Sequence, residues 1–236
     1  MSLRRAAPLA LLVPLLPLAG CATGHSRASR NFTPASDAQR QETLAAVAAA
    51  QKKAGGLAAS RLLYDARMSP GKGPAVPGTL AVTYDGHDVA RASLTGPFGK
   101  RVAEYDAGSV TGEDRQALVV DPGALRAVLS GSWPGPPDSV EGCDGDDCLV
   151  VWTPVRKDAG GSLVGVSAVV DRRAARLRTL VLEGDRGRLV VDYEGESDPW
   201  PRRLAAREEK SGRGLKLVLV AQETAGAAPA ASPPSP

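Results

Sequence analysis

The sequence predicts a mainly β protein with a few helices, and three observations support this fold class. From residue 78 onward, apolar and polar residues alternate in short runs, the two-residue period of half-buried strands. Turn signals rich in Gly and Asp separate these runs at regular intervals, which favours an antiparallel sheet. Only two segments, near 34–55 and 121–131, have helical spacing and helix end signals.

The first of these segments predicts an N-terminal helix. Pro34 suits a first turn, and the glycines at 55 and 56 end the segment. The residues expected to face the core recur at helical spacing: Leu44, Val47, Ala48 and Ala54.

The expected strands lie at 78–84, 89–95, 102–105, 116–120, 149–153, 163–171, 176–182, 188–193, 202–207 and 215–220. Asp85 and Gly86 form the turn between the first two. Asp121 and Pro122 cap a short helix that ends near Gly131. A rigid irregular loop follows at 133–137, and the Ala/Pro tail at 222–236 is expected to be disordered.

The first twenty residues have the pattern of a secretory signal. Arg4 and Arg5 form a basic start, and the apolar run at 6–18 is too short and too proline-rich for a membrane span. The segment Leu-Ala-Gly-Cys at 18–21 resembles the lipobox of bacterial lipoproteins. We therefore expect cleavage before Cys21 and lipidation of its thiol, with 21–33 as a flexible tether. Ala22, where retention at the inner membrane favours Asp, points to the outer membrane of a two-membrane host.

The charge balance gives no indication of a nucleic-acid partner. Removing residues 1–20 removes two arginines and no acid, which leaves 27 basic and 26 acidic side chains and a net charge of +1. Nucleic-acid-binding domains are usually markedly basic on one face, whereas both signs are interspersed here.

Two cysteines remain after Cys21, and they lie in Cys-Asp-Gly-Asp-Asp-Cys. We expect a Cys143–Cys148 disulfide, because an oxidising compartment favours it and the four intervening residues can fold back. A calcium site is the alternative, although the EF-hand spacing and its terminal glutamate are missing. We expect neither a metal nor a cofactor.

Nothing in the chain indicates catalysis. The two histidines are His25, in the tether, and His87, beside a predicted turn. There is no nucleophile elbow, metalloprotease helix or phosphate-binding loop. Acidic pairs at 146–147 and 208–209 are typical of solvated surface. We expect a protein that is not an enzyme.

The segment at 91–105, an amphipathic strand running into Gly-Pro-Phe-Gly and out again, resembles the LolB-type lipoproteins. The wider order of features agrees with that family: a lipobox, an N-terminal helix, strands, a short helix before Trp-Pro-Gly, and closing strands at 192–193, 199–204 and 214–219. The resemblance covers roughly residues 36–221. The insertion at 143–148, the tail and the scarcity of aromatic residues depart from it.

The resemblance implies a half-open antiparallel β-barrel whose helices cover an apolar cavity, formed by a domain at 34–221. LolB-type proteins take lipoproteins from the soluble carrier LolA and place them in the outer membrane. The implied partners are therefore acylated lipoproteins or lipids, a LolA-like carrier and the inner leaflet of the outer membrane, and we expect a monomer. The candidate lid and cavity residues are Leu80, Val82, Leu94, Leu125, Val128, Leu129 and Trp133. Ordinary core packing is the alternative role for the helix residues among them.

The resemblance also implies a membrane-inserting loop at Pro97, Phe98 and Gly99, flanked by two basic residues that could meet anionic head groups. The alternative is that Phe98 folds back onto the sheet. Two functions remain open at this point. One is a lipid-handling protein, and the other is an envelope lipoprotein with a closed core that docks another protein.

Overall fold

The structure is a computed structural model of the chain, and it describes residues 31–106, 109–114, 120, 122–152, 157–158, 161–184, 187–197 and 200–224. The expected signal and Cys21 lie outside the described residues, as do most of the tether, residues 225–236 of the tail, Asp121 and most of the expected strand at 116–120. Residues 222–224 were wrongly assigned to the disordered tail, because they pair with the start of the strand at 60–70. Within the described residues, no helix combines the length and the apolar character that crossing a membrane requires.

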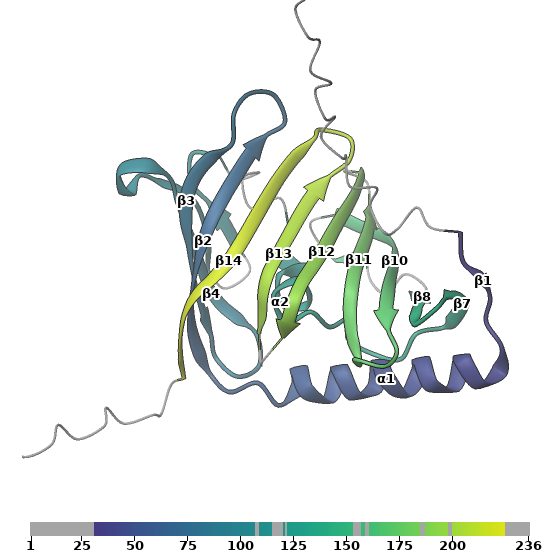
Figure 1. Cartoon of the computed structure of the whole chain (residues 1–236). Coiled ribbons are helices and arrows are strands. Elements are labelled where there is room, and N and C mark those ends of the chain that lie inside the picture. Colours follow the sequence, from purple (N-terminus) through teal and green to yellow (C-terminus); the bar gives the residue numbers. More distant parts are fainter. Residues whose placement is uncertain are drawn as a thin grey trace, which may run out of the picture.

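The described residues form one antiparallel sheet and two α-helices (Figure 1). The strands are β1 (Thr33–Pro34), β2 (Ser60–Pro70), β3 (Val76–Tyr84), β4 (Val89–Thr95), β5 (Arg101–Asp106), β6 (Ser109–Thr111), β7 (Ser139–Asp144), β8 (Asp147–Trp152), β9 (Lys157–Asp158), β10 (Gly161–Asp171), β11 (Arg176–Gly184), β12 (Gly187–Ser197), β13 (Pro201–Glu208) and β14 (Arg213–Thr224). The helices are α1 (Asp37–Gly55) and α2 (Pro122–Ser130), and a 3₁₀ turn, η2, spans Pro97–Gly99.

The sheet is curved and does not close. Its strand order is β1-β7-β8-β10-β11-β12-β13-β14-β2-β3-β4-β5-β6, and β9 pairs with β10 beside this path. The last strand, β14, pairs with β2 along almost its whole length and so joins the early and late hairpins into one surface. The predicted fold class, a mainly β half-open antiparallel barrel, is therefore confirmed (Figure 1).

Helix α1 begins three residues later than the sequence predicts. Ser36 is the N-cap, and with Gln39 it forms a capping box, in which Gln39 N donates to Ser36 Oγ over 3.3 Å and Ser36 N donates to Gln39 Oε1 over 2.9 Å. Pro34 lies upstream, in β1. It was wrongly placed in the first turn because the capping box is a stronger start signal than a nearby proline.

The buried face of α1 was also predicted only in part. Thr43, Ala46 and Val47 are the buried residues, while Leu44 is 42% exposed and Ala48 is exposed as well. Small side chains suit this face because α1 lies close against the ends of β7, β10 and β11 (Figure 1). Val47 and, partly, Ala54 were predicted correctly.

Most expected strands are present, but five strands of the described residues were missed, four of them short and one, β2, long and regular. Strand β4 has the predicted bounds, and Asp85 and Gly86 turn the chain between β3 and β4. The missed strands are β1, β2, β6, β7 and β9. Thr33, assigned to the tether, pairs with Cys143 of β7, so the folded part begins inside the expected tether.

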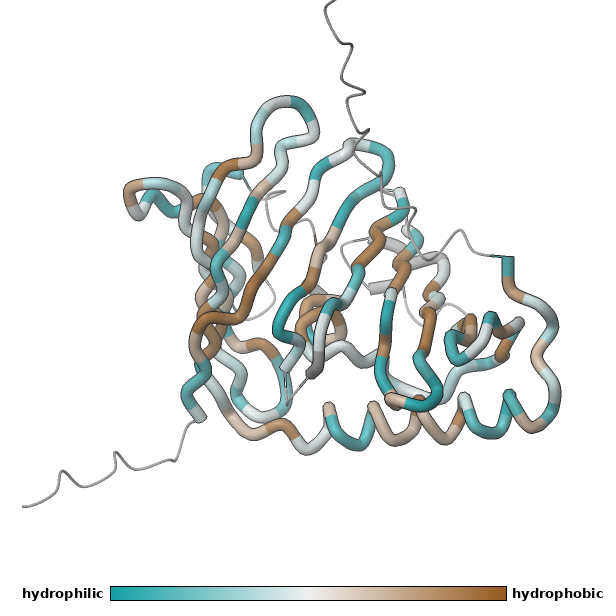
Figure 2. The backbone as a smooth tube through the Cα atoms, in the orientation of Figure 1, coloured by the Kyte–Doolittle hydropathy of each residue, from teal (hydrophilic) through white to brown (hydrophobic). Residues whose placement is uncertain are grey.

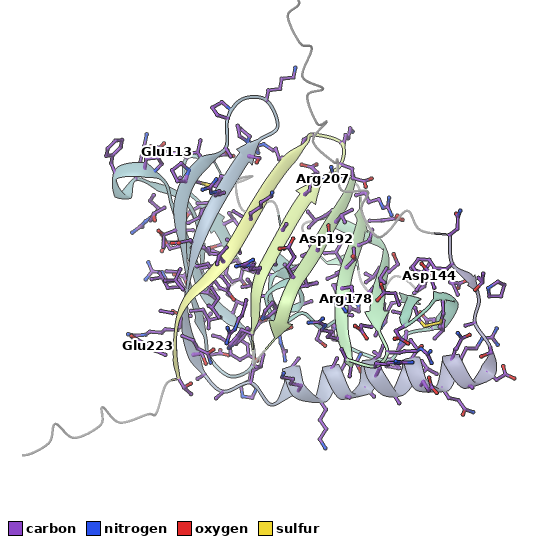
Figure 3. The ribbon with its side chains drawn as sticks, viewed as in Figure 1. Glu113, Asp144, Arg178, Asp192, Arg207 and Glu223 are labelled. Carbon is purple, nitrogen blue, oxygen red and sulfur yellow. A yellow bond between two sulfur atoms is a disulfide. The ribbon has the colours of Figure 1, made fainter. Side chains whose placement is uncertain are left out.

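The Cys143–Cys148 disulfide is confirmed. The two cysteines are register partners across the β7–β8 hairpin, with their Cα atoms 4.1 Å apart. Figure 3 shows the bridge beside Asp144. Both cysteines are buried in the core cluster, so the bridge fixes the hairpin that carries the edge strand β1. Within the described residues, no group of three or more His, Cys, Asp or Glu side chains could hold a metal ion.

Candidate functional site

The inner face of the curved sheet is a continuous apolar surface. Alternate residues of its strands point inward and belong to one buried cluster, as the strand period requires. Apolar residues follow this pattern along the strands in Figure 2. Members from the strands include Leu62, Tyr64, Ala66, Leu80, Val82, Leu94, Val150, Val166, Leu180, Val191, Tyr193, Leu204 and Leu217.

Helix α2 contributes its apolar face to this cluster, and Figure 1 shows it behind β12 and β13, within the curve of the sheet. Leu125, Val128 and Leu129 are at most 4% exposed. Gly131 ends the helix at φ +63°, and a Cβ there would lie 3.2 Å from Pro201 Cγ, so close packing as well as backbone conformation favours glycine. The helix thus fills the place where the resemblance implies a cavity.

One buried hydrogen bond ties α2 to the sheet. The hydroxyl of Tyr193, on β12, donates to the backbone carbonyl of Val128 over 2.9 Å. Val128 is in the last turn of α2, and its carbonyl also accepts from Gly131 N over 3.4 Å, so the tyrosine adds a second bond at this end of the helix. Burial first, and then the neighbouring Tyr64 and Asp192, raise the pKa of Tyr193, which keeps its hydroxyl protonated as a donor.

The structure brings the predicted lid and cavity residues together. Leu80, Val82 and Leu94 are on the inner faces of β3 and β4, and they share the core cluster with the three α2 leucine and valine side chains. Trp133 is half-buried against the cluster, and its carbonyl accepts from Gln51 Nε2 of α1 over 2.8 Å. Burial in one cluster agrees with the core-packing alternative as well as with a lid.

Sequence reasoning missed the polar members of this surface. Tyr64 lies in the missed strand β2, Tyr193 was predicted only as the end of a strand, and Trp200 contributed only to the resemblance. The hydroxyl of Tyr64 and the indole nitrogen of Trp200 are buried and have no hydrogen-bond partner among the described residues. Burial raises the pKa of Tyr64. The alternation of Leu62, Tyr64 and Ala66 with charged residues could have revealed β2.

The loop at Pro97–Gly99 projects from one end of the sheet (Figure 1). Phe98 is fully exposed and has φ 60°, an unfavourable conformation for a residue with a side chain. The backbone closes around it, because Gly96 N donates to Lys100 O over 2.7 Å and Lys100 N donates to Pro97 O over 3.3 Å. Phe98 therefore does not fold back onto the sheet.

The two basic residues after this loop are both engaged in ion pairs. Lys100 Nζ lies 2.9 Å from Glu113 Oε2, and Arg101 Nη1 lies 2.7 Å from Glu104 Oε2. Figure 3 places Glu113 at the projecting loop. Both basic side chains remain more than half exposed, so they are partly neutralised rather than unpaired.

The acidic residues considered at the sequence level lie on the surface, mostly in ion pairs. Asp146 Oδ1 contacts Arg172 Nη2 at 3.2 Å and Arg173 Nε at 3.0 Å, and Glu209 contacts Arg188 at 3.4 Å. His87 is exposed in the turn between β3 and β4. None of these groups reaches the apolar inner face.

A separate surface pocket of about 610 Å³ lies between α1 and the turn joining β10 to β11. Glu42, Ala45, Ala46, Arg172 and Arg173 line it. Arg172 pairs with Glu42 and Asp146, so its charge is already matched. The pocket lies where the helix meets the sheet, and it is not part of the apolar inner face.

No protein-family model matches the sequence, and no curated protein matches it significantly. Solved structures do match. A LolA superfamily protein from Nitrosomonas europaea has a TM-score of 0.50 and 15% identity, over 75% of this chain and 93% of that one. The fold is LolA-like.

Two further structures match this LolA-like chain with lower TM-scores and lower identity. A domain assigned to outer-membrane lipoprotein sorting from Vibrio parahaemolyticus has a TM-score of 0.46 and 8% identity, over 80% of this chain and 94% of that one. A DUF1329 family protein from Desulfovibrio piger has a TM-score of 0.47 and 9% identity, over 81% of this chain and 95% of that one. At such identities the comparisons concern the fold alone and do not distinguish LolB-type lipoproteins within it.

Proposed function

We propose that the mature protein is a lipid-anchored, periplasm-facing lipoprotein of the outer membrane that binds acyl chains of lipoproteins or lipids and helps to insert them into that membrane. The observation that carries the proposal is the apolar inner face of an open sheet, covered by one short helix. Such a surface binds hydrocarbon without directional contacts. It needs no catalytic group, so the protein is a carrier and not an enzyme.

Exchange between α2 and an acyl chain gives a physical basis for both loading and release. Each buried leucine or valine of α2 contributes about 1.5–3 kcal/mol, and each buried methylene of an acyl chain contributes about 0.8 kcal/mol. Displacing Leu125, Val128 and Leu129 therefore costs about 4.5–9 kcal/mol, which burial of about 6 to 11 methylenes offsets. An acyl chain at least this long can take the place of the helix, and the helix returns when the chain departs.

The remaining parts of the proposal concern attachment and delivery. Cys21 would carry the lipid anchor, and a LolA-like carrier would supply acylated lipoproteins. The exposed Phe98, held out by the turn at Pro97–Gly99, would enter the inner leaflet of the outer membrane during delivery. Transfer of an aromatic ring from water into an apolar layer lowers the free energy.

The test of this function compares two charge substitutions at exposed apolar residues. Phe98→Glu should leave the melting temperature and cargo binding unchanged but reduce delivery of acylated cargo to vesicles of outer-membrane lipids. The matched control is Leu63→Glu, on β2, where the leucine is 40% exposed on the outer face. Unimpaired delivery by Phe98→Glu, or equal loss with both variants, would count against the membrane loop.

A docking lipoprotein with a closed core is the second candidate, and the burial of α2 favours it. Leu125, Val128 and Leu129 pack as ordinary core side chains do, and Tyr193 holds the helix in place. On that account α2 never leaves, and neither acyl chains nor lipids bind. The two functions differ in whether the inner face can be occupied by anything but α2.

A further inference from the structure

The apolar inner face contains buried hydrogen-bond donors that the folded chain does not use. Tyr64 is 0% exposed and Trp200 is 1% exposed, yet the Tyr64 hydroxyl and Trp200 Nε1 have no partner among the described residues. A buried donor without a partner costs about 1–3 kcal/mol. Other tyrosines of the core are satisfied, since Tyr84 donates to Gly86 O over 3.2 Å and Tyr193 donates to Val128 O over 2.9 Å.

These donors share the inner face with the residues that hold α2. Tyr64 is the register partner of Leu80 on one side and of Leu219 on the other, in the middle of the surface. Tyr64, Tyr193 and Trp200 belong to the same buried cluster. When α2 leaves, the Tyr193 hydroxyl loses Val128 O and becomes a further free donor.

The donors are neutral, and no lysine or arginine is among the fully buried residues of the described part of the chain. The buried polar or charged residues among those described are Thr43, Ser60, Glu104, Ser132, Asp171 and Thr179, and none of them is basic. A carboxylate buried here would be unpaired, which is costly. A neutral carbonyl oxygen accepts hydrogen bonds from phenol and indole groups without bringing a charge.

We infer that Tyr64, together with Tyr193 and Trp200, forms a subsite for the ester carbonyls of a diacylglyceryl group, so that the protein binds acyl esters in preference to free fatty acids and ether-linked chains. The inference rests on the proposed acyl-binding function and specifies its ligand. Hydrocarbon contacts supply most of the affinity, and the donors recognise the point at which two chains join glycerol. In the unloaded protein, this recognition costs the free energy of keeping the Tyr64 hydroxyl buried without a partner.

The experiment measures displacement of a fluorescent acyl probe from the mature chain carrying Cys21→Ser. The competitors are a diacylglycerol and the dialkyl ether of glycerol with the same chains, which lacks both carbonyls. We expect the ester to bind about 3- to 10-fold more tightly than the ether, the value of one neutral hydrogen bond. Oleate should compete less well than methyl oleate at neutral pH.

Tyr64→Phe should abolish the preference for ester over ether while leaving ether binding unchanged. Its melting temperature should not fall, because the substitution removes only an unpartnered hydroxyl. The matched control is Tyr84→Phe, which removes a satisfied hydroxyl from the same core and should keep the preference.

Three results would overturn part of this account. Equal binding of ester and ether by the unsubstituted protein, or a preference that survives in Tyr64→Phe, would overturn the ester subsite and leave acyl binding standing. Failure of every acyl competitor and of the probe to bind would instead overturn the proposed function and the subsite with it.

Discussion

Tyr193 of β12 donates its hydroxyl to the carbonyl of Val128, 65 positions earlier in the chain, and this bond holds α2 against the inner face of the sheet. Both groups are buried, so the bond forms away from competing water. The bond joins α2, which would have to move for an acyl chain to bind, and β12, which would keep its place in the sheet. The free energy needed to move α2 away from the inner face, and hence access to that face, depends on this contact.

Tyr193→Phe should therefore release α2 more readily. Loss of the hydroxyl removes one buried hydrogen bond and leaves Val128 O with Gly131 N as its remaining donor, at 3.4 Å, which should lower the free energy of unfolding by about 0.5–1.5 kcal/mol. Amide hydrogen exchange in α2 should accelerate more than exchange in β12, and an acyl probe should bind faster. Unchanged exchange in α2 would show that the hydrogen bond does not hold the helix.

The disulfide should stabilise the β7–β8 hairpin and, through it, the whole fold. Replacing Cys143 and Cys148 together by alanine should lower the free energy of unfolding by about 2 kcal/mol, as expected for a short closed loop. Urea denaturation measures the effect. A reductant should destabilise the original protein and leave the double variant unaffected, and an unchanged urea midpoint for the variant would contradict the prediction.

Glu104 should contribute to the acid sensitivity of folding. Its hydrogen bond from Arg91 lowers its pKa below the usual range, while burial opposes and Arg101 assists the shift. A carboxyl whose pKa is lower in the folded state stabilises the fold above the pKa of the unfolded state, about 4.3, and this stabilisation is lost as pH falls through the lowered value.

The free energy of unfolding of the unsubstituted protein should thus decrease on acidification more steeply than that of Glu104→Gln. Denaturation at a series of pH values below about 5 gives the two slopes. Glu223→Gln, at the exposed end of β14, is the control and should follow the unsubstituted protein. Parallel curves for Glu104→Gln and the unsubstituted protein would show that Glu104 does not contribute to the acid sensitivity of folding.

Cys21→Ser should abolish lipid attachment, because only the thiol can receive the diacylglyceryl group. The variant should appear as a soluble or uncleaved precursor after membrane fractionation. Recovery of the serine variant with outer membranes at the level of the original protein would contradict the lipobox interpretation.

The hairpins that were predicted well have strong local signals. Strand β4 follows the turn at Asp85-Gly86, and Ala92 and Leu94 alternate with more exposed residues, so signals within a few residues of sequence predict its bounds. Strand β7 contains Gly142 and a bulge between Val140 and Gly142, which breaks the alternation, and it escaped notice. In α1, the choice of Thr43 over Leu44 as a core residue depends on how the helix meets the strand ends.

The candidate site was predictable only for its apolar residues. Leu80, Val82 and Leu94 follow strand alternation, and the apolar face of α2 follows helical spacing. The contact between Tyr193 and Val128 and the unpartnered hydroxyl of Tyr64 depend on the curvature of the whole sheet. No local pattern encodes them, because they join segments far apart in the sequence.

The most direct test of the central claim, that the inner face accepts acyl chains when α2 leaves it, is equilibrium binding of a fluorescent fatty-acyl probe to the mature Cys21→Ser chain. We predict saturable binding of one probe per chain, displaced by a diacylated peptide and not by the same peptide without its acyl chains, with faster amide exchange in α2 when the probe is bound. Absence of saturable binding, with α2 as protected in the presence of probe as in its absence, would contradict the claim and favour the docking lipoprotein with a closed core.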